Sequence, residues 1–220
     1  MSSNYLNREL SFAVALPVGP IAEAASVPIL QELRQKTAKH HRALEQTADI
    51  LGCMNSKPAY GQLLLKFLAI YAPLESRIAN VPRLRAWLPD LSQRTKVPLL
   101  RSDLLALGIS LTHSACVAVP EIQSVASAFG CLYVLEGSTL GGQIITGHVA
   151  ERLGLGAENG CRFFASYGPR VGEFWKVFGS AIEKFSSAHE VCRNEVVEAS
   201  ISTFNCFSRW LVDAPSAGQN

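Results

Sequence analysis

Apolar and small residues recur every three or four positions between Ile29 and Leu51, which is the spacing of one face of an α-helix. Charged side chains such as Glu32 and Lys36 fall outside this stripe. Pro28 suits the first turn of a helix, and Gly52 suits the position just after its end. The pattern therefore predicts an amphipathic helix over 29–51. Its stripe consists of Ile29, Leu30, Leu33, Thr37, His41, Leu44, Ala48 and Leu51.

The helical period continues through most of the remaining chain. Two segments do not follow it. Segment 81–91, "VPRLRAWLPDL", contains two prolines and is expected to be a loop or a short helical piece. Segment 154–168, "GLGAENGCRFFASYG", is expected to be a loop. The period predicts further helices over 56–78, 98–108, 121–153, 169–187 and 190–211.

No segment alternates apolar and polar residues over the length of a strand, and Asn159-Gly160 lacks the flanking alternation of a hairpin. The prediction is an all-α, single-domain bundle of six to eight helices. We expect residues 28–213 to form this domain, 1–27 to be a flexible N-terminal extension, and 214–220 to be a disordered tail.

Composition narrows the class of protein. Hydrophobic residues make up 48% of the 220 and charged residues 17%, as in a folded globular chain. A net charge of +2 gives no indication of a nucleic-acid or membrane-surface partner. No apolar run is long enough to span a membrane, and Phe12–Val18 is too short, and too interrupted by Pro17, for a secretory signal. The six scattered cysteines form no CxxC pair, which favours small buried hydrophobes in a reducing, cytoplasmic compartment.

The segment "TAKHHRALE" places His41 on the apolar stripe and turns His40 away from it by about 100°. A histidine on an apolar face is either a core residue with its hydrogen bonds satisfied or a ligand. Glu45 lies one turn later on the same face. Its carboxylate is either a solvated charge or the partner that orients the imidazole of a metal ligand.

The segment "YVLEGSTLGGQ" places Gly137, Gly141 and Gly142 inside a helical stretch, where each costs about 1 kcal/mol of helix propensity relative to alanine. Close packing of two helices accounts for Gly137 and Gly141, which share a face. The adjacent pair Gly141-Gly142 also favours a kink. Two interpretations therefore stay open: the glycines admit a neighbouring helix, or they admit a large flat ligand.

Together, "LRQKTAKHHRALE" and "YVLEGSTLGG" resemble the proximal and distal helix motifs of the heme oxygenases, and most closely those of the bacterial, bacteriophytochrome-associated branch. Weaker similarity continues through "KVPLLRSDLLALG", "YGPRVGEFWKVF" and "TFNCFSRWL". The similarity covers about residues 29 to 211. It implies a helical bundle that holds heme between a proximal helix and a kinked distal helix.

The resemblance assigns roles position by position. His41 would be the axial ligand of heme iron and Glu45 its hydrogen-bonding neighbour. Arg34 and Tyr133 match positions that contact the heme propionates; each is otherwise a solvated charge or a core aromatic residue. The distal side would be lined by Gly137, Ser138, Gly141 and Gly142. Of these, Gly137 and Ser138 match catalytic positions.

One position departs from the animal-type members of the family. Where these have an aspartate that organises the water used in oxygen activation, this sequence has Ser138 and no carboxylate. Serine is common there in the bacterial branch, so the resemblance still implies activity, with the water network resting more on backbone carbonyls.

The resemblance implies oxidative opening of heme to biliverdin, with release of iron and carbon monoxide. Dioxygen and electrons from a separate reductase or ferredoxin would be consumed, and a bilin-accepting phytochrome is a further implied partner. Two alternatives stay open. The protein could be a non-catalytic heme carrier or sensor of the same fold, or a helical interaction domain without a cofactor, in which the glycines only pack helices.

Overall fold

The computed structural model describes residues 27–48, 50–111 and 117–213. The expected N-terminal extension, apart from Val27, and the expected tail 214–220 lie outside the described residues. Within the described ranges the regular structure is entirely helical, so the prediction of an all-α fold is confirmed. The α-helices are α1 Ile29–Thr47, α2 Lys57–Ala79, α3 Leu84–Trp87, α4 Val97–Ala106, α5 Val125–Ser138, α6 Gly142–Leu153, α7 Arg162–Ala165, α8 Val171–Ala188 and α9 Arg193–Asp213. The short 3₁₀ helices are η1 Gly52–Met54, η2 Leu91–Arg94, η3 Thr139–Gly141, η4 Gly168–Arg170 and η5 Glu190–Cys192.

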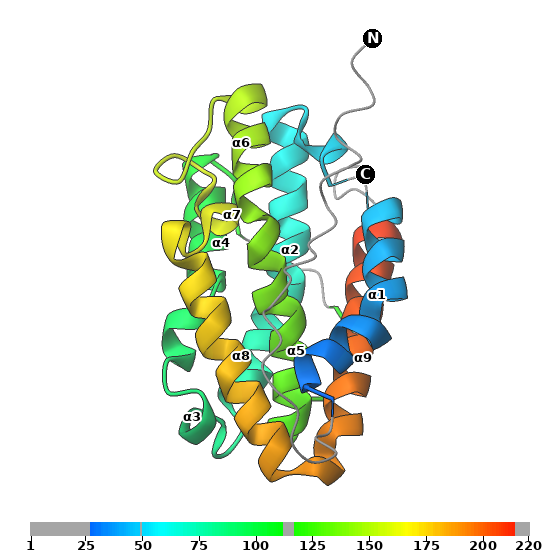
Figure 1. Ribbon diagram of the computed structural model, residues 1–220. Helices are drawn as coiled ribbons and strands as arrows, with labels where there is room; N and C mark the ends of the chain where they lie inside the picture. Colours follow the sequence, from blue (N-terminus) through cyan, green and yellow to red (C-terminus); the bar gives the residue numbers. More distant parts are fainter. Residues whose placement is uncertain (1–26, 49, 112–116, 214–220) are drawn as a thin grey trace.

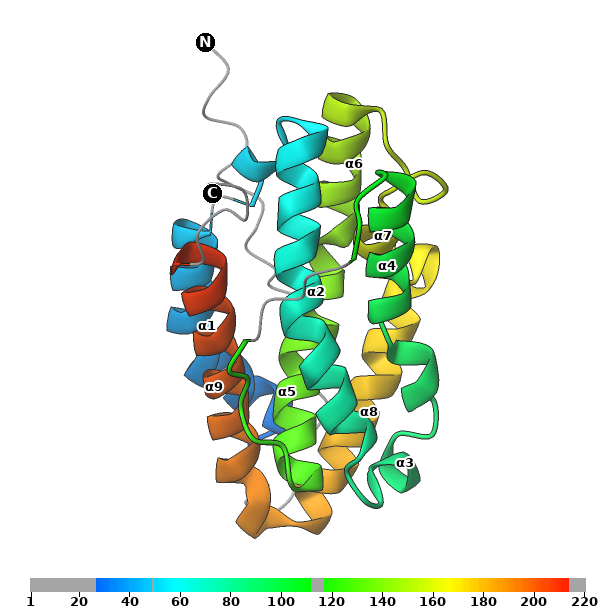
Figure 2. The same cartoon turned by 180° about the vertical axis from the view of Figure 1, so that it is seen from behind.

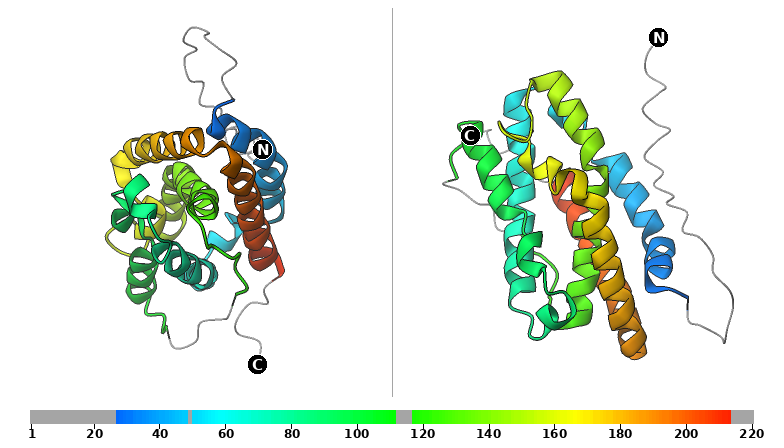
Figure 3. Two further views of the ribbon diagram at one scale, coloured as in Figure 1. Left: turned by 90° about the horizontal axis from the view of Figure 1, so that it is seen from below. Right: turned by 60° about the vertical axis from the view of Figure 1, so that its left-hand side comes forward.

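The long helices lie along the length of the molecule, with α5 and α6 near its centre (Figure 1). Helix α9 packs against both α5 and α1, and α2 packs against α4. Seen from behind, α2 runs through the middle of the bundle, with α1 and α9 on one side of it and α3 and α4 on the other (Figure 2). The two views in Figure 3 show α1 at the edge of the bundle, beside α9. No helix of the described ranges is long and apolar enough to cross a membrane.

Helix α1 is anchored at its first turn by the two helices beside it. The Glu183 carboxylate of α8 accepts hydrogen bonds from the backbone N–H groups of Ile29 and Leu30 at 3.0 and 3.1 Å. Arg193 of α9 pairs with Glu32 at 2.7 Å. These contacts satisfy N–H groups that a helix start leaves without partners, and they fix the direction of the helix that carries His41.

The predicted helix over 121–153 is wrong at its start and interrupted in its middle. Arg77 donates to the carbonyls of Val119 and Pro120 at 3.1 and 2.7 Å, so this segment is held outside the helix. Ser124 then caps α5 through a reciprocal pair of hydrogen bonds with Ser127, and the helix begins at Val125. The interruption is η3, which confirms the kink that the double glycine predicted.

Helix α7 lies in the segment that the sequence predicted to be a loop. Its first N–H groups, those of Arg162 and Phe163, donate to the Asp103 carboxylate at 2.8 and 2.7 Å. Asp103 is buried on α4, far away in the sequence. A cap supplied from a distant helix leaves no local signal, which explains why this helix was missed.

The expected burial of the cysteines is confirmed for only some of them. Cys131, Cys161 and Cys206 are buried, whereas Cys192 is half-buried and Cys53 is exposed. The described cysteines are all free thiols. Burial raises the pKa of Cys131 to about 12, as expected for an inert core thiol. The expectation of burial is wrong for Cys53, which lies in the short η1.

Candidate heme site

His41 and Glu45 lie close together on α1. The Nδ1 atom of His41 is 3.2 Å from the Glu45 carboxylate, and the imidazole side chain is 51% exposed. In the neutral tautomer that carries its proton on Nδ1, the Nδ1–H group donates a hydrogen bond to Glu45 and Nε2 has a free lone pair. The ring also contacts Phe204 of α9 edge-on. The geometry therefore holds His41 in an orientation that leaves Nε2 available to a ligand.

The neighbouring His40 has a different environment. Its Nδ1 atom lies 3.0 Å from the Asn205 amide oxygen, so this histidine is bonded to α9. The two histidines thus differ in their hydrogen-bonding partners, and the prediction chose His41 over His40 as the iron ligand. One histidine is bonded to the next helix, and the other to a carboxylate on its own helix.

The distal segment is a helix broken by one 3₁₀ turn. Helix α5 ends at Ser138, η3 covers Thr139–Gly141, and α6 begins at Gly142. The Thr139 hydroxyl donates to the Glu136 carbonyl at 2.7 Å, a side-chain bond of the kind that competes with the helical pattern and bends helices. The break thus coincides with the cluster of glycines that the sequence singled out.

The three glycines differ in what surrounds them. A Cβ added to Gly142 would lie 2.2 Å from the Phe164 carbonyl oxygen, so packing against the α7 segment requires glycine there. Among the residues that the structure describes, none has an atom within 4 Å of a Cβ added to Gly141, and a Cβ on Gly137 would only touch the Trp175 ring at 3.9 Å. Packing therefore explains Gly142 but leaves Gly141 unexplained, and a glycine without neighbours fits a ligand that approaches the backbone.

The Ser138 hydroxyl is held by two hydrogen bonds. It donates to the Leu135 carbonyl at 2.7 Å, so the Tyr71 hydroxyl, 3.1 Å away, must be the donor to Ser138. Burial raises the pKa of Tyr71, which keeps the phenol protonated at neutral pH. Ser138 itself is exposed, and one of its lone pairs is left to accept a hydrogen bond.

Arg34 of α1 and Tyr133 of α5 come close to each other. Burial raises the pKa of the Tyr133 phenol, while a hydrogen bond with Thr37 and the Arg34 charge lower it. Arg34 is exposed, and Tyr133 is half-buried beside the Trp175 ring. The structure therefore brings these two predicted residues together where the proximal and distal helices face each other.

Sequence reasoning missed two features beside the distal helix. Trp175 of α8 covers Gly137 and Tyr133. Glu136 is only 2% exposed and is paired with Arg94 at 2.6 Å. A sequence signal for Glu136 did exist: it is a lone carboxylate in the apolar run "CLYVLEG", and a buried carboxylate requires a partner. The identity of that partner was not readable.

Comparison with known proteins identifies the class. The heme oxygenase family model matches residues 27–213. A heme oxygenase of Xanthomonas campestris pv. campestris (strain 8004) is 33% identical over 98 residues, which are 42% of this chain and 54% of the relative. The match thus spans about half the length of that relative.

Solved heme oxygenases share the fold at low sequence identity. The NO- and CO-bound enzyme of Neisseria meningitidis superposes with a TM-score of 0.75 at 19% identity, over 88% of this chain and 96% of that one. Heme oxygenase 2 of Chlamydomonas reinhardtii, solved without heme, gives 0.72 at 14%, over 88% and 100%. The protein of Leptospira interrogans gives 0.68 at 17%, over 85% and 100%. The chain belongs to the heme oxygenase family.

Proposed function

We propose that this protein binds heme between α1 and the broken distal helix and opens it oxidatively to biliverdin, releasing iron and carbon monoxide. The observation that carries the proposal is the pairing of His41 with Glu45, which leaves Nε2 free. The open space beside Gly141 supports it: no side chain of the described ranges lies near a Cβ built there, and a flat macrocycle packs closely only against backbone without side chains. Membership of the heme oxygenase family supports the same reaction.

The residues present fit heme. His41 Nε2 would ligate the iron, and Arg34 and Tyr133 would bind the propionates, for which the two-pronged guanidinium is well suited. Gly137 and Gly141 would admit the ring. When bound, heme supplies both the porphyrin that is opened and the iron that activates dioxygen.

The chain's own residues then have distinct tasks. The Glu45 carboxylate accepts a hydrogen bond from the Nδ1–H group of His41, which fixes the tautomer and makes Nε2 a stronger electron-pair donor. Tyr71 and the Leu135 carbonyl fix the Ser138 hydroxyl, which can accept a hydrogen bond from a water. These two hydrogen bonds fix the position of the hydroxyl, so Ser138 would hold such a water in a defined place.

The remaining expectations belong to this proposal. Dioxygen and electrons from a separate reductase or ferredoxin would be consumed. Biliverdin could pass to a bilin-accepting phytochrome. We infer a cytoplasmic location, because the reaction needs electrons from a reductase or ferredoxin in a reducing compartment.

Heme binding and turnover test the proposal directly. Hemin titration of the purified protein should give a saturating Soret band, and dioxygen with an electron donor should replace that band with biliverdin absorbance. A persistent Soret band without biliverdin would identify a heme carrier or sensor. No saturable Soret shift would identify a cofactor-free interaction domain.

The neighbouring histidine provides a matched control for the axial ligand. His41→Ala should abolish the histidine-ligated spectrum and biliverdin formation, because Nε2 is lost. His40→Ala removes an imidazole bonded only to Asn205 and should leave both intact. Equal behaviour of the two variants would overturn the assignment of His41.

A further inference from the structure

A buried ionic cluster lies against the break in the distal helix. Arg94 donates to Glu136 at 2.6 Å and binds both oxygens of Asp90 at 3.0 and 2.7 Å. The Arg94 and Glu136 side chains are only 1% and 2% exposed. Removing one member of such a pair leaves the other charge buried without compensation, so the position of Glu136 is strongly determined.

Tyr167 provides a second attachment to Glu136. Its hydroxyl donates to the Glu136 carboxylate at 2.8 Å, and its ring stacks on Phe174 with centroids 3.8 Å apart. The Lys96 ammonium lies 3.8 Å from the centre of the same ring and 3.8 Å from Glu136. Besides α5, which carries Glu136, four separate parts of the chain contribute to the cluster: η2 with the preceding Asp90, the residue before α4, the α7–η4 segment and α8.

The segment that carries Tyr167 contacts the distal helix on both sides of its break. Before the break, Tyr167 bonds the Glu136 side chain, and the backbone carbonyl of Glu136 accepts a hydrogen bond from the Thr139 hydroxyl. After the break, the Phe164 carbonyl oxygen lies only 2.2 Å from the position that a Cβ of Gly142 would take. Ser166 lies between Phe164 and Tyr167 in the sequence and has a positive φ of 48°, which is a strained backbone conformation for a residue with a side chain. The turn at Ser166 leads directly into Tyr167, which bonds Glu136.

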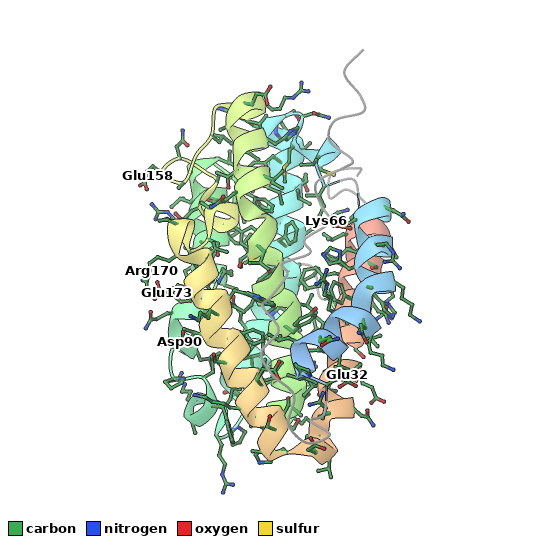
Figure 4. All side chains as sticks on the ribbon, in the orientation of Figure 1. Glu32, Lys66, Asp90, Glu158, Arg170 and Glu173 are labelled. Atoms are coloured by element: carbon green, nitrogen blue, oxygen red, sulfur yellow. The ribbon has the colours of Figure 1, made fainter. Side chains whose placement is uncertain are left out.

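The cluster reaches the distal helix from the side opposite the proximal helix. Asp90, its outermost member, lies on the flank that also carries Arg170 and Glu173, whereas Glu32 of α1 lies on the other flank (Figure 4). The cluster therefore approaches the distal helix from the flank away from Glu32 of α1 (Figure 4).

We propose that Glu136, Arg94 and Tyr167 are positioning residues that clamp the break in the distal helix, and thereby set the orientation in which heme is opened. The part concerning heme rests on the proposed function. A helix end held by a buried ion pair and a hydrogen bond cannot slide or rotate without breaking them. The choice of porphyrin edge, and so the biliverdin isomer, would follow from that fixed backbone.

Two hydroxyl deletions test the clamp. Tyr167→Phe removes only the hydrogen bond to Glu136. The control, Ser200→Ala, removes a buried hydroxyl that donates to the Gly130 carbonyl, on the same α5 but two turns before the break. In heme-free protein, Tyr167→Phe should speed amide hydrogen exchange across 137–142 by about tenfold, while Ser200→Ala leaves that segment unchanged. Unchanged exchange in Tyr167→Phe would overturn the clamp.

The second readout is the ratio of biliverdin isomers. Tyr167→Phe and Glu136→Gln should shift that ratio away from the wild-type value, and Ser200→Ala should not. Faster exchange with an unaltered ratio would overturn the effect on heme orientation. If the wild-type protein formed no biliverdin, the proposed function would fail, while the exchange measurement would still decide whether the clamp exists. Tyr167→Phe keeps the test usable if Glu136→Gln does not fold.

Discussion

At the scale of single residues, the site depends on how each side chain divides its hydrogen bonds. His41 uses Nδ1 to bond Glu45, which leaves Nε2 available. The Ser138 hydroxyl donates a hydrogen bond to the Leu135 carbonyl and accepts one from the Tyr71 hydroxyl. The first pair could be expected from the spacing of four residues along one helix. The second could not, because Tyr71 is on α2 and only the fold brings it to Ser138.

Replacement of Glu45 tests the role of the carboxylate behind His41. Glu45→Gln should weaken heme binding by about tenfold, because a neutral amide makes the imidazole a poorer donor than a carboxylate does. Gln46→Ala changes the exposed neighbour on the same turn and should have no effect. The measurement is hemin affinity by Soret titration, and equal affinities in the two variants would contradict the role.

The adjacent glycines should respond to alanine in opposite ways. Gly142→Ala should lower the free energy of unfolding by about 2 kcal/mol, because the new Cβ collides with the Phe164 carbonyl. Gly141→Ala should leave the free energy of unfolding unchanged or raise it by up to about 1 kcal/mol, since the new methyl group meets no neighbouring side chain of the described residues and alanine favours helix. Gly141→Ala should nevertheless weaken heme binding. Urea denaturation of heme-free protein and hemin titration measure the two effects.

Hemin affinity equal to wild type in Gly141→Ala would indicate that no ligand approaches that backbone. Equal destabilisation of the two variants would indicate that Gly141 is also a packing residue.

At the scale of elements, α9 holds the two halves of the site together. It packs on α5 through Gly130, where an added Cβ would lie 2.3 Å from the Val196 carbonyl. It also packs on α1, the helix of His41. The periodicity of apolar residues predicted these helices, but which helix each apolar face packs against depends on side-chain shapes that a sequence pattern does not encode.

The contact between α5 and α9 can be tested at Gly130. Gly130→Ala should lower the free energy of unfolding by about 2 kcal/mol, because neither backbone can move without disturbing the core. Gly147→Ala on α6, where an added Cβ meets no neighbour within 4 Å in the part of the chain that the structure describes, should be neutral or slightly stabilising. Urea denaturation decides between them, and equal stability of the two variants would show that the helices can separate to admit a methyl group.

At the scale of the whole molecule, the buried charges make stability depend on pH. Burial lowers the pKa of Lys96 from 10.5 to about 8, although the nearby Glu136 carboxylate raises it. Below pH 8 the amine is protonated in both the folded and the unfolded state. Between about 8 and 10.5 only the unfolded state keeps the proton, so this group makes the folded state more stable as the pH rises.

Comparison with Lys96→Met isolates this contribution from other titrating groups, such as the buried tyrosines. The free energy of unfolding of the wild type, minus that of the variant, should increase by about 2 kcal/mol between pH 7 and 10. Urea denaturation at several pH values measures it. A difference that stays constant with pH would contradict a buried, protonated Lys96.

The sequence by itself determined the helices with an apolar stripe, the kink at the glycines, and the two motifs that carry His41 and the distal backbone. These features are local, because helix periodicity, glycine propensity and the spacing of four residues act within a few turns of the chain. Only the tertiary structure decided what surrounds them. It placed Asp103 at the start of α7, Tyr71 on Ser138, Phe164 against Gly142, and Arg94 and Tyr167 on Glu136. Each of these partners comes from a distant part of the chain, where burial and not sequence proximity sets the contact.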